Sequence, residues 1–337
     1  MGPSPYREAG FAPLRRVRPR SAVSILHPLW GEVPFDLKYR FGELTLLSRR
    51  FRALTLRNHF LSLPADPNQP PPPLARLGRD VDVIVTRSHP LRETLPRMTV
   101  LDGAIRYAIK HYARYYTTLS GTLDEYLTKF SAKTRNTLRR KVRRVLERGS
   151  GSEMREYKAR DDMEEFCRLA RTVSAKSYQE RLLDAGLPDG PEFVRELREL
   201  AERNAVRGYI LFLQHEPVAY LCCPATDGIL LYSYLGYNPE HADLSPGTVL
   251  QYLVLERLFN EQVFRAFDFS EGQGAHKGFF ATQEVLCADI CYFSPSVSVR
   301  AWLRAHIACD VMSTAVGRGL ETLRLKATVR RFLRRRG

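Results

Sequence analysis

The chain has 337 residues, of which 44% are hydrophobic, and a formal net charge of +15 at pH 7. A hydrophobic fraction of this size can form the core of one large or two modest globular domains, and no apolar run approaches the roughly 20 residues that a membrane-spanning helix needs. The positive charge favours anionic partners such as nucleic acid, acidic lipid headgroups or polyphosphate cofactors. Net charge alone does not distinguish between these three classes of partner.

The N-terminal segment and the cysteines indicate the compartment. Residues 1–20 are basic, but no long apolar segment follows them, so we expect no secretory signal and a cytoplasmic protein. The six cysteines form no CxxC pair, and no histidine cluster accompanies them. Cys222 and Cys223 are adjacent in an apolar stretch, where buried free thiols are expected. We therefore expect no metal cofactor.

The first third of the chain predicts short strands and one loop. Residues 42–56 contain candidate strands, and the proline run in 63–77 predicts an extended linker or exposed loop. Residues 80–88, "DVDVIVTRS", alternate apolar and polar side chains as a strand does. For residues 101–116 we expect a helix with an aromatic face, followed by a short strand.

Helix signals become clear after residue 120. Thr122 and Glu125 form a T-x-x-E capping box. Residues 131–149 predict a helix closed by Gly149, with an apolar stripe and a strongly basic remainder. The stripe consists of Leu138, Val142, Val145 and Leu146. The basic residues are Lys133, Arg135, Arg139, Arg140, Lys141, Arg143, Arg144 and Arg148. Asp161 and Glu164 are predicted to cap another helix, and Pro191 is predicted to begin a third.

Three strands and a helix follow in an informative order. Residues 206–214, 218–226 and 229–237 predict an antiparallel meander, with a hairpin at Asp227-Gly228. A helix then begins near Ser245, and the chain returns to a strand over 263–270. Because a strand–helix–strand return favours a parallel pair, the sequence predicts an α/β (α+β) fold with a mixed, mostly antiparallel central sheet flanked by helices.

The corner Ser245-Pro246-Gly247 is a candidate anion site. The Ser245 hydroxyl can cap the helix, and Pro246 suits its first turn because its missing N–H costs nothing there. Gly247, Thr248 and Val249 would present backbone amides at the positive end of the helix, where phosphate binds. A simple helix start is the alternative. Ligands in open sheets prefer such switch points, which favours the phosphate interpretation.

Four segments carry a resemblance to a known family. They are "FSAKTRNTLRRKVRRVLERG", "GYILFLQHEPVAYLCC", "YSYLGYNPEHADLSPGTVLQYLVLERLF" and "FDFSEGQGAHKGFF". Together they resemble the GNAT acyltransferase superfamily, most closely its BioF2-like and CelD-like branch, which is similar to the FemAB aminoacyl transferases. The resemblance implies a GNAT acyltransferase domain over 116–297, preceded by a degenerate GNAT-like lobe over 1–115. Residues 298–337 would then form a basic amphipathic C-terminal tail.

The resemblance also implies a donor, acetyl-CoA or another acyl-CoA. The family's Q/R-x-x-G-x-G/A loop binds the coenzyme A pyrophosphate, and Gly247 matches its last glycine. Ala242 stands at the basic or amide position and Ser245 at the earlier glycine, so the loop departs from the pattern. The predicted cofactor-binding residues are Ser245, Gly247, Thr248 and Val249.

The candidate catalytic residues follow from the chemistry of acyl transfer to an amine. Glu271, or less favourably Asp268, would accept the amine proton directly or through water. A backbone amide in 232–237 would stabilise the oxyanion, and Tyr234 or Tyr237 would protonate the leaving thiolate. The structural alternatives are ion pairing or solvation for the carboxylates and aromatic packing for the tyrosines.

The candidate substrate-binding residues are Lys277, Arg135 and Arg139. The resemblance implies that Lys277 lies near an acceptor or donor phosphate, whereas His276 fits a loop residue better than a base. The basic helix would bind acceptor phosphates or a tRNA backbone, or would be a solvated face. The tail would form a solvated terminal helix or contact an anionic membrane at its inner face.

We predict that the protein is an N-acyltransferase that moves an acyl group from acyl-CoA to an amine, with acetyl as the favoured acyl group. The resemblance implies that the acceptor is a sugar, a nucleotide sugar or a small metabolite, in envelope or exopolysaccharide synthesis. Two alternatives stay open. One is aminoacyl transfer from charged tRNA, and the other is a non-catalytic GNAT scaffold.

Overall fold

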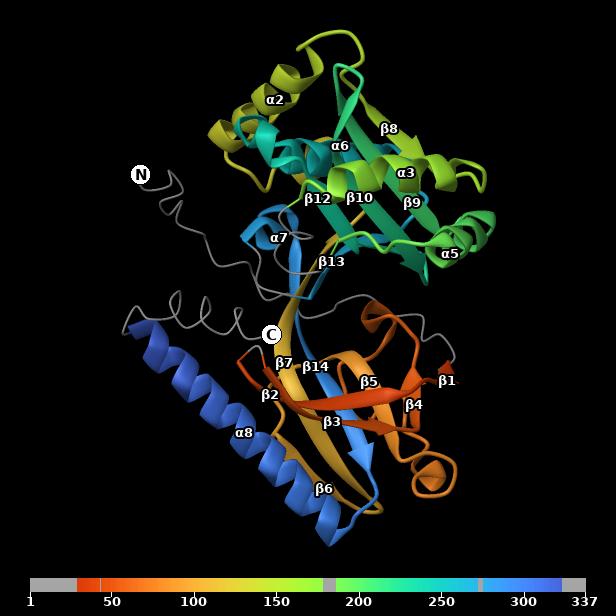
Figure 1. Ribbon diagram of the computed structural model, residues 1–337, viewed down its shortest axis with the longest axis vertical. Helices are drawn as coiled ribbons and strands as arrows, with labels where there is room; N and C mark the ends of the chain where they lie inside the picture. The colour runs from red at the N-terminus through yellow and green to blue at the C-terminus, as the bar shows by residue number, and fades with distance from the viewer. Residues whose placement is uncertain (1–28, 43, 178–185, 272–274, 323–337) are drawn as a thin grey trace. The chain divides into compact units, whose positions relative to one another are not determined.

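The computed structural model describes residues 29–42, 44–177, 186–271 and 275–322 (Figure 1). These residues divide into two compact units, 113–285 and a second unit formed by 29–112 with 286–322. Strands β7 (Ala104–Thr118) and β14 (Gln283–Phe293) contribute residues to both units. The unit boundaries fall at different residues from the domain limits given above, which stay predictions.

The first unit contains the mixed sheet that the sequence predicts. Its strand order is β7-β13-β11-β10-β9-β8, and β12 also pairs with β10. Among the described strand pairs of this unit, only β11 and β13 run parallel, which confirms a mostly antiparallel sheet with one parallel step. The strands are β8 (Met154–Tyr157), β9 (Val206–Leu213), β10 (Glu216–Thr226), β11 (Ile229–Leu231), β12 (Tyr234–Tyr237) and β13 (Ala266–Glu271).

The helices of this unit begin close to the predicted signals. The Thr122–Glu125 capping box is present, whereas the prediction that Asp161 caps a helix is wrong. Asp161 makes no side-chain cap, and Asp162 instead accepts the amide of Ala159 at 2.9 Å. The helices are α1 (Leu123–Leu127), α2 (Ala132–Leu146), α3 (Asp162–Ser174), α5 (Pro191–Glu202), the 3₁₀ segment η3 (Pro239–Leu244), α6 (Pro246–Glu261) and α7 (Ala275–Phe280).

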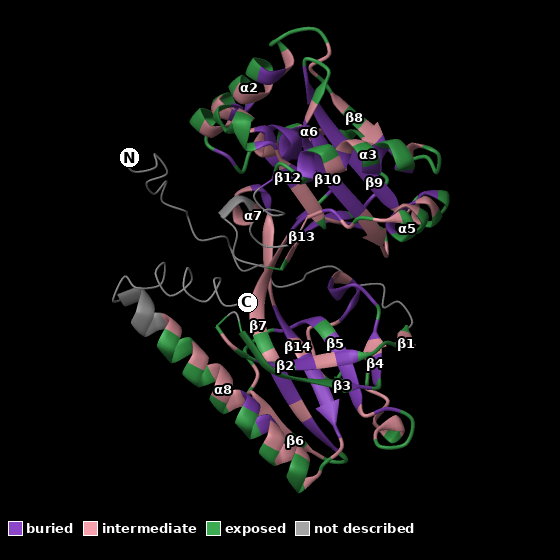
Figure 2. Ribbon diagram, viewed as in Figure 1, coloured by how far each residue is buried: buried purple, intermediate pink, exposed green. Residues whose placement is uncertain are grey.

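Two hydrophobic cores lie on opposite faces of this sheet. Alternate residues of β9 point into different cores: Tyr209 packs with α1, α2 and α6, and Ile210 packs with α3 and α5. Strands covered on both faces read as nearly continuous apolar runs, which is why β9 and β10 show little polar alternation. Figure 2 shows β9 and β10 as largely buried strands between helices with exposed outer faces.

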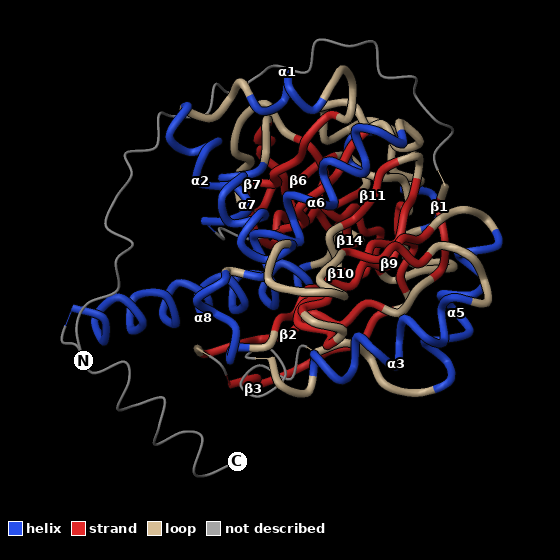
Figure 3. Tube along the Cα trace, turned by 90° about the horizontal axis from the view of Figure 1, so that it is seen from above, coloured by secondary structure: helices blue, strands red, loops and turns tan. Residues whose placement is uncertain are grey.

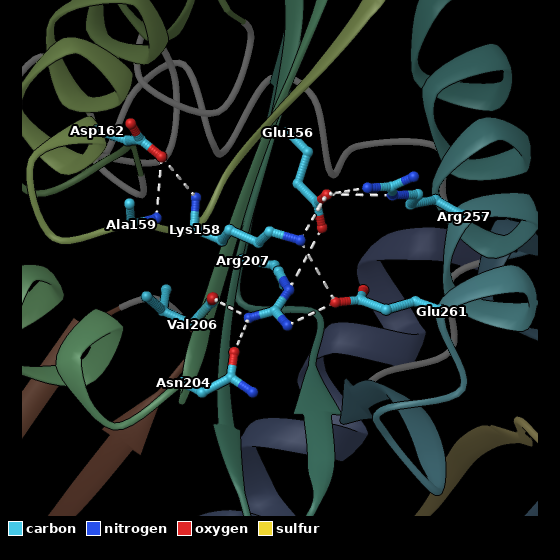
Figure 4. Close-up of polar contacts among 9 residues, drawn as sticks. All are labelled: Glu156, Lys158, Ala159, Asp162, Asn204, Val206, Arg207, Arg257 and Glu261. Carbon is cyan, nitrogen blue, oxygen red and sulfur yellow. Dashed lines mark hydrogen bonds and ion pairs between the residues drawn. The ribbon is translucent and has the colours of Figure 1, made fainter.

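A buried ion network fixes the C-terminal end of α6 to β8 and β9 (Figure 4). The Arg207 side chain is 1% exposed, and its Nη2 donates to Glu261 Oε1 at 2.8 Å. Its Nε lies 3.3 Å from Glu156 Oε1. Arg257, farther out on α6, donates to Glu156 at 2.8 Å, and Lys158 lies 3.6 Å from the same carboxylate. Buried charges need such partners, because an unpaired one is costly to desolvate.

The second unit has its own sheet and a long helix. The strand order is β1-β4-β5-β14-β7, with β6 on β7, and β2 and β3 form a separate hairpin. Helix α8 (Val297–Thr322) contacts β2, and Figure 3 shows the two elements side by side. The strands are β1 (Trp30–Glu32), β2 (Phe35–Phe41), β3 (Leu44–Phe51), β4 (Ala53–Leu56), β5 (Val83–Pro90) and β6 (Met98–Leu101), with short 3₁₀ turns at Phe60–Ser62 and Leu74–Arg76.

The prediction of a helix over residues 101–116 is wrong. Asp102-Gly103 forms a turn in which Gly103 adopts φ of 74°, and the following residues form β7. A positive φ suits glycine and favours a tight hairpin. Isoleucine, tyrosine and alanine in this segment then pair with β6, from Met98↔Tyr107 to Leu101↔Ala104.

Polar contacts hold α8 within the second unit. The Tyr39 hydroxyl donates to Trp302 O at 2.7 Å, and the Tyr107 hydroxyl lies 2.6 Å from His306 Nδ1. Of the predicted basic tail, residues 298–322 lie in α8 and residues 323–337 lie outside the described residues. Within the described residues, no helix is long and apolar enough to cross a bilayer.

Candidate active site

The end of β13 brings together an ion pair and a strained turn. Asp268 is fully buried and forms an ion pair with Arg114 of β7. Its Oδ1 also accepts the amide of Ser270 at 2.9 Å. Ser270 adopts φ of 60°, a left-handed conformation that is uncommon for serine. The β13–β7 register shifts between Asp268 and Glu271, as expected of a bulge.

These contacts distinguish the two predicted carboxylates. Asp268 is engaged in structural contacts, the alternative given for it above, whereas Glu271 is exposed at the strand end. Lys277 of α7 donates to Glu271 O at 2.5 Å and to Ser270 Oγ at 3.1 Å, and burial lowers the pKa of its ammonium group. Residues 272–274 of the predicted loop lie outside the described residues, and so does the side chain of His276.

Among the described residues β12 pairs only with β10, and its other edge faces the side of the sheet where β13 lies. The parallel β11–β13 pairing runs from Ile229↔Ala266 to Leu231↔Asp268. The chain then continues as β12 on β10, where the Asn238 amide, just beyond the strand, donates to Val218 O at 2.8 Å. Antiparallel ladders alternate backbone groups toward and away from the partner. The amides of Leu235 and Tyr237 therefore point away from β10, where an oxyanion could be bound.

The two predicted tyrosines of β12 lie on opposite faces of the sheet. Tyr234 packs edge-on against Phe193 of α5, with ring centroids 5.6 Å apart, and burial raises the pKa of its phenol. Tyr237 lies next to Gly247 at the start of α6, because a Cβ added to Gly247 would be 3.6 Å from Tyr237 Cδ1. Only Tyr237 is therefore next to the predicted phosphate corner.

The start of α6 differs in detail from the prediction. Ser245 adopts φ of 53° and its hydroxyl makes no cap, so the predicted Ser245 cap is wrong. Its carbonyl instead accepts the amides of Thr248 at 3.0 Å and Val249 at 3.1 Å. Those two amides are thus already hydrogen-bonded. Among the described residues, only the Gly247 amide of this predicted set lacks a hydrogen-bond partner.

Helix α2 supplies a cation to this corner. Lys141 Nζ donates to Ser245 Oγ at 3.0 Å, and Arg144 lies 3.2 Å from Asp243 in η3. Lys141 is not among the site residues that the sequence predicts. A signal for it existed, because Lys141 lies three and four residues from Leu138 and Val145, the buried residues of α2. A lysine on the packed stripe of a helix points toward a neighbouring element.

The predicted arginines of α2 have internal partners. Arg135 Nη1 donates to Phe130 O at 2.6 Å, and Arg139 lies 3.8 Å from Asp124. Within the described chain, the exposed cations of this helix without an acidic partner are Lys133 and Arg140, and the same holds for exposed Arg148 just beyond the helix.

Two hollows lie beside α5 on the other face of the sheet, the larger between α3 and α5 and the smaller between α5 and β12. The larger, about 830 Å³, is lined by five arginines and contains none of the predicted site residues. The smaller, about 450 Å³, includes Tyr234 and four acidic residues. Over the described residues, no group of three His, Cys, Asp or Glu side chains is placed to hold a metal ion.

The parallel β11–β13 pairing ends on the side of the sheet where α6 begins. Residues 132–278 match the family model for the acetyltransferase (GNAT) domain. This segment runs from α2 to α7 and includes the α6 corner and the end of β13. The chain therefore contains a GNAT acetyltransferase domain of the BioF2-like and CelD-like family, as the sequence predicts. No match is found among the curated proteins.

Three solved structures are distantly similar to the chain. FemX is 12% identical with a TM-score of 0.47, covering 81% of this chain and 90% of FemX. A conserved protein of unknown function from Bacteroides thetaiotaomicron is 14% identical with a TM-score of 0.45, covering 78% and 83%. L-PGS from Bacillus licheniformis is 16% identical with a TM-score of 0.39, covering 66% and 71%. These scores are low, so the assignment rests on the family model.

Proposed function

We propose that this protein is an N-acyltransferase that moves an acyl group, acetyl in the simplest case, from acyl-CoA to an amine. The observation that carries the proposal is the free edge of β12 beside the start of α6. Gly247, with its unpaired amide, lies against Tyr237, whose own amide points away from β10. One donor molecule could then bind with its phosphates at the N-terminus of α6 and its thioester at the edge of β12.

Few groups at the start of α6 would bind the phosphate of the donor. Because Thr248 and Val249 donate to Ser245 O, the Gly247 amide and the Lys141 ammonium are the groups that favour an anion here. Lys141 would thus supply the positive charge that the family pattern places at the position of Ala242. Its hydrogen bond to Ser245 Oγ keeps it within reach of the helix end.

The transfer itself needs three groups. The amine nitrogen attacks the thioester carbonyl, and the oxyanion is stabilised by the amide of Leu235 or Tyr237. The C–N bond forms, the C–S bond breaks, and the proton from the amine passes to Glu271 through water. The leaving thiolate takes its proton from Tyr237. Asp268 and Arg114 would hold the end of β13, from which Glu271 projects.

The acceptor that best fits the family resemblance is an amine on a sugar or a nucleotide sugar. Exposed Lys133 and Arg140 on α2, with Arg148 just beyond it, would attract the phosphates of such a molecule. The same surface and the net charge of +15 favour a second candidate, aminoacyl transfer from charged tRNA. The cytoplasmic location and the contact of the tail with an anionic membrane stay predictions.

Calorimetric titration with acetyl-CoA tests the donor site. Wild-type protein should bind, and Gly247→Glu should not, since a carboxylate there repels phosphate and covers the bare amide. The nearest atom to a Cβ at Gly247 is 3.6 Å away, so the variant should fold. Gly317→Glu in α8, where a Cβ meets nothing within 4 Å, is the matched control and should bind normally.

Other results would point elsewhere. Equal binding by wild type and Gly247→Glu would remove the corner as the donor site. No binding by wild type, together with salt-sensitive binding of charged tRNA, would favour aminoacyl transfer. Binding of neither ligand would favour a GNAT scaffold without catalysis.

A further inference from the structure

Gln251 of α6 is a buried polar side chain without a complete set of partners. It is 4% exposed, and its Nε2 has no hydrogen-bond partner among the described residues. A buried donor left unpaired destabilises a folded protein, and such groups in native structures usually have a reason. The rest of the buried face of α6 is apolar or aromatic, so packing alone gives no reason for glutamine at this position.

The contacts of α6 show which way Gln251 points. Gly247 lies against Tyr237 of β12, and Phe259 packs on Tyr126 of α1, with ring centroids 5.1 Å apart. At about 100° per residue, Gln251 lies about 40° around the helix from Gly247, and Phe259 lies about 120° around in the same direction. Gln251 therefore faces the sector between β12 and α1.

That sector is the side on which β13 lies. In the strand order, β13 follows β11 and precedes β7, and β7 leads directly into α1. Phe269 of β13 belongs to the same core as the buried face of α6. The carboxamide of Gln251 is thus directed toward the place where the β11–β13 pairing ends and β12 continues on β10. It lies about 6 Å along the helix axis from Gly247.

We propose, resting on the function proposed above, that Gln251 binds the arm of the acyl donor. Coenzyme A carries two amide groups between its phosphates and its sulfur, and each has a carbonyl oxygen that can accept a hydrogen bond. With its phosphates at Gly247 and its thioester at the free edge of β12, the donor passes Gln251. The Nε2 of Gln251 donates to one of these carbonyl oxygens and gains the partner it lacks.

Gln251→Met tests this proposal, because methionine keeps the length of the side chain and its helix propensity. Calorimetry compares two ligands, acetyl-CoA and adenosine 3′,5′-bisphosphate, which lacks the arm. We expect the Kd for acetyl-CoA to rise about fivefold to tenfold, the loss of one buried hydrogen bond, and the Kd for the bisphosphate to stay the same. The Tm of the ligand-free variant should rise, since an unpaired polar group is removed.

Tyr209→Phe is the matched control. Tyr209 lies on β9 in the same core, is fully buried, and its hydroxyl also lacks a partner among the described residues. Removing that hydroxyl should raise the Tm without changing the Kd for acetyl-CoA. A gain in stability combined with a loss of donor affinity is therefore expected only for Gln251→Met.

Three results would overturn the proposal in distinguishable ways. Unchanged acetyl-CoA binding by Gln251→Met would show that the carboxamide does not contact the donor. An equal loss for acetyl-CoA and the bisphosphate would show a general disturbance of α6. Failure of wild-type protein to bind acetyl-CoA would refute the proposed function itself, and this inference with it.

Discussion

Replacing Arg207 by methionine should strongly destabilise the first unit. Methionine preserves most of the apolar volume but removes every hydrogen bond and both carboxylate contacts of a side chain that is 1% exposed. Nη1 donates to Asn204 Oδ1 at 2.8 Å and to Val206 O at 2.9 Å, and Nη2 donates to Glu261 at 2.8 Å. Removal leaves these acceptors in a largely buried site.

The loss in the free energy of unfolding depends on which partners Glu156 and Glu261 keep when Arg207 is removed. Breaking a buried pair by removing one partner costs about 3–5 kcal/mol. Glu156 and Glu261 keep Lys158, which is 46% exposed and 3.6–3.8 Å away, and Glu156 keeps Arg257. We therefore expect a loss near the lower end, about 3 kcal/mol. Arg257→Met removes a contact to the same carboxylate, but its side chain is 48% exposed, so it should cost less than about 1 kcal/mol.

Hydrogen exchange is the appropriate measurement, because it separates the first unit from the second. Peptides covering β9 and α6 should lose protection in Arg207→Met by an amount that matches about 3 kcal/mol, and peptides covering β5 should not change. If Arg207→Met and Arg257→Met cost the same, both below about 1 kcal/mol, burial does not decide the energetics of this network and the reasoning is wrong.

Three further predictions concern the proposed site and the second unit. With an amine that supports transfer, Glu271→Gln should lower kcat/KM about a hundredfold and leave acetyl-CoA affinity by calorimetry unchanged; an unchanged rate would remove it as the base. Lys141→Met should weaken acetyl-CoA binding severalfold, whereas Arg140→Met on the exposed face of α2 should not. Equal effects of the two substitutions would show that the overall positive charge of α2, and not a specific contact of Lys141, favours binding. Because burial lowers the pKa of His306 from 6.5, the unfolded chain takes up the proton first. The free energy of unfolding of the second unit should therefore fall as pH decreases below about 6.5, by at most about 1.4 kcal/mol per pH unit from this group. Denaturant unfolding of His306→Gln should show a weaker dependence of this free energy on pH. The same pH dependence in the variant and the wild type would show that another group causes the effect.

The parts of the fold that the sequence predicts well are those with local signals. Asp227-Gly228 forms the hairpin, with φ of 52° and 70°, because both residues tolerate a positive φ. The capping box begins α1, and Pro246 begins α6. In β7 the signals conflicted, since its aromatic residues suit a helix face and a strand alike, and pairing with β6 and β13 decided the outcome.

The candidate site was predicted only in part because its contacts are distant in sequence. Lys141 meets Ser245 across 104 residues, and Arg114 meets Asp268 across 154. No local pattern connects such positions. The prediction that Thr248 and Val249 present bare amides failed for a related reason: the left-handed Ser245 turns its carbonyl onto both amides, and nothing in the sequence marks serine for that conformation.

Helix α6 connects these observations, because its two ends have different roles. Its C-terminal end is fixed through Glu261 to Arg207, and a straight helix then sets the position of Gly247 about 21 Å away. The amide of Gly247 and the Nε2 of Gln251, which have no partner among the described residues, lie in the first two turns. A ligand that binds only the folded state stabilises it in proportion to the logarithm of its concentration above Kd. The donor would therefore restore at the N-terminal end the hydrogen bonds that the ligand-free helix lacks, while the ion network holds that end in place for binding.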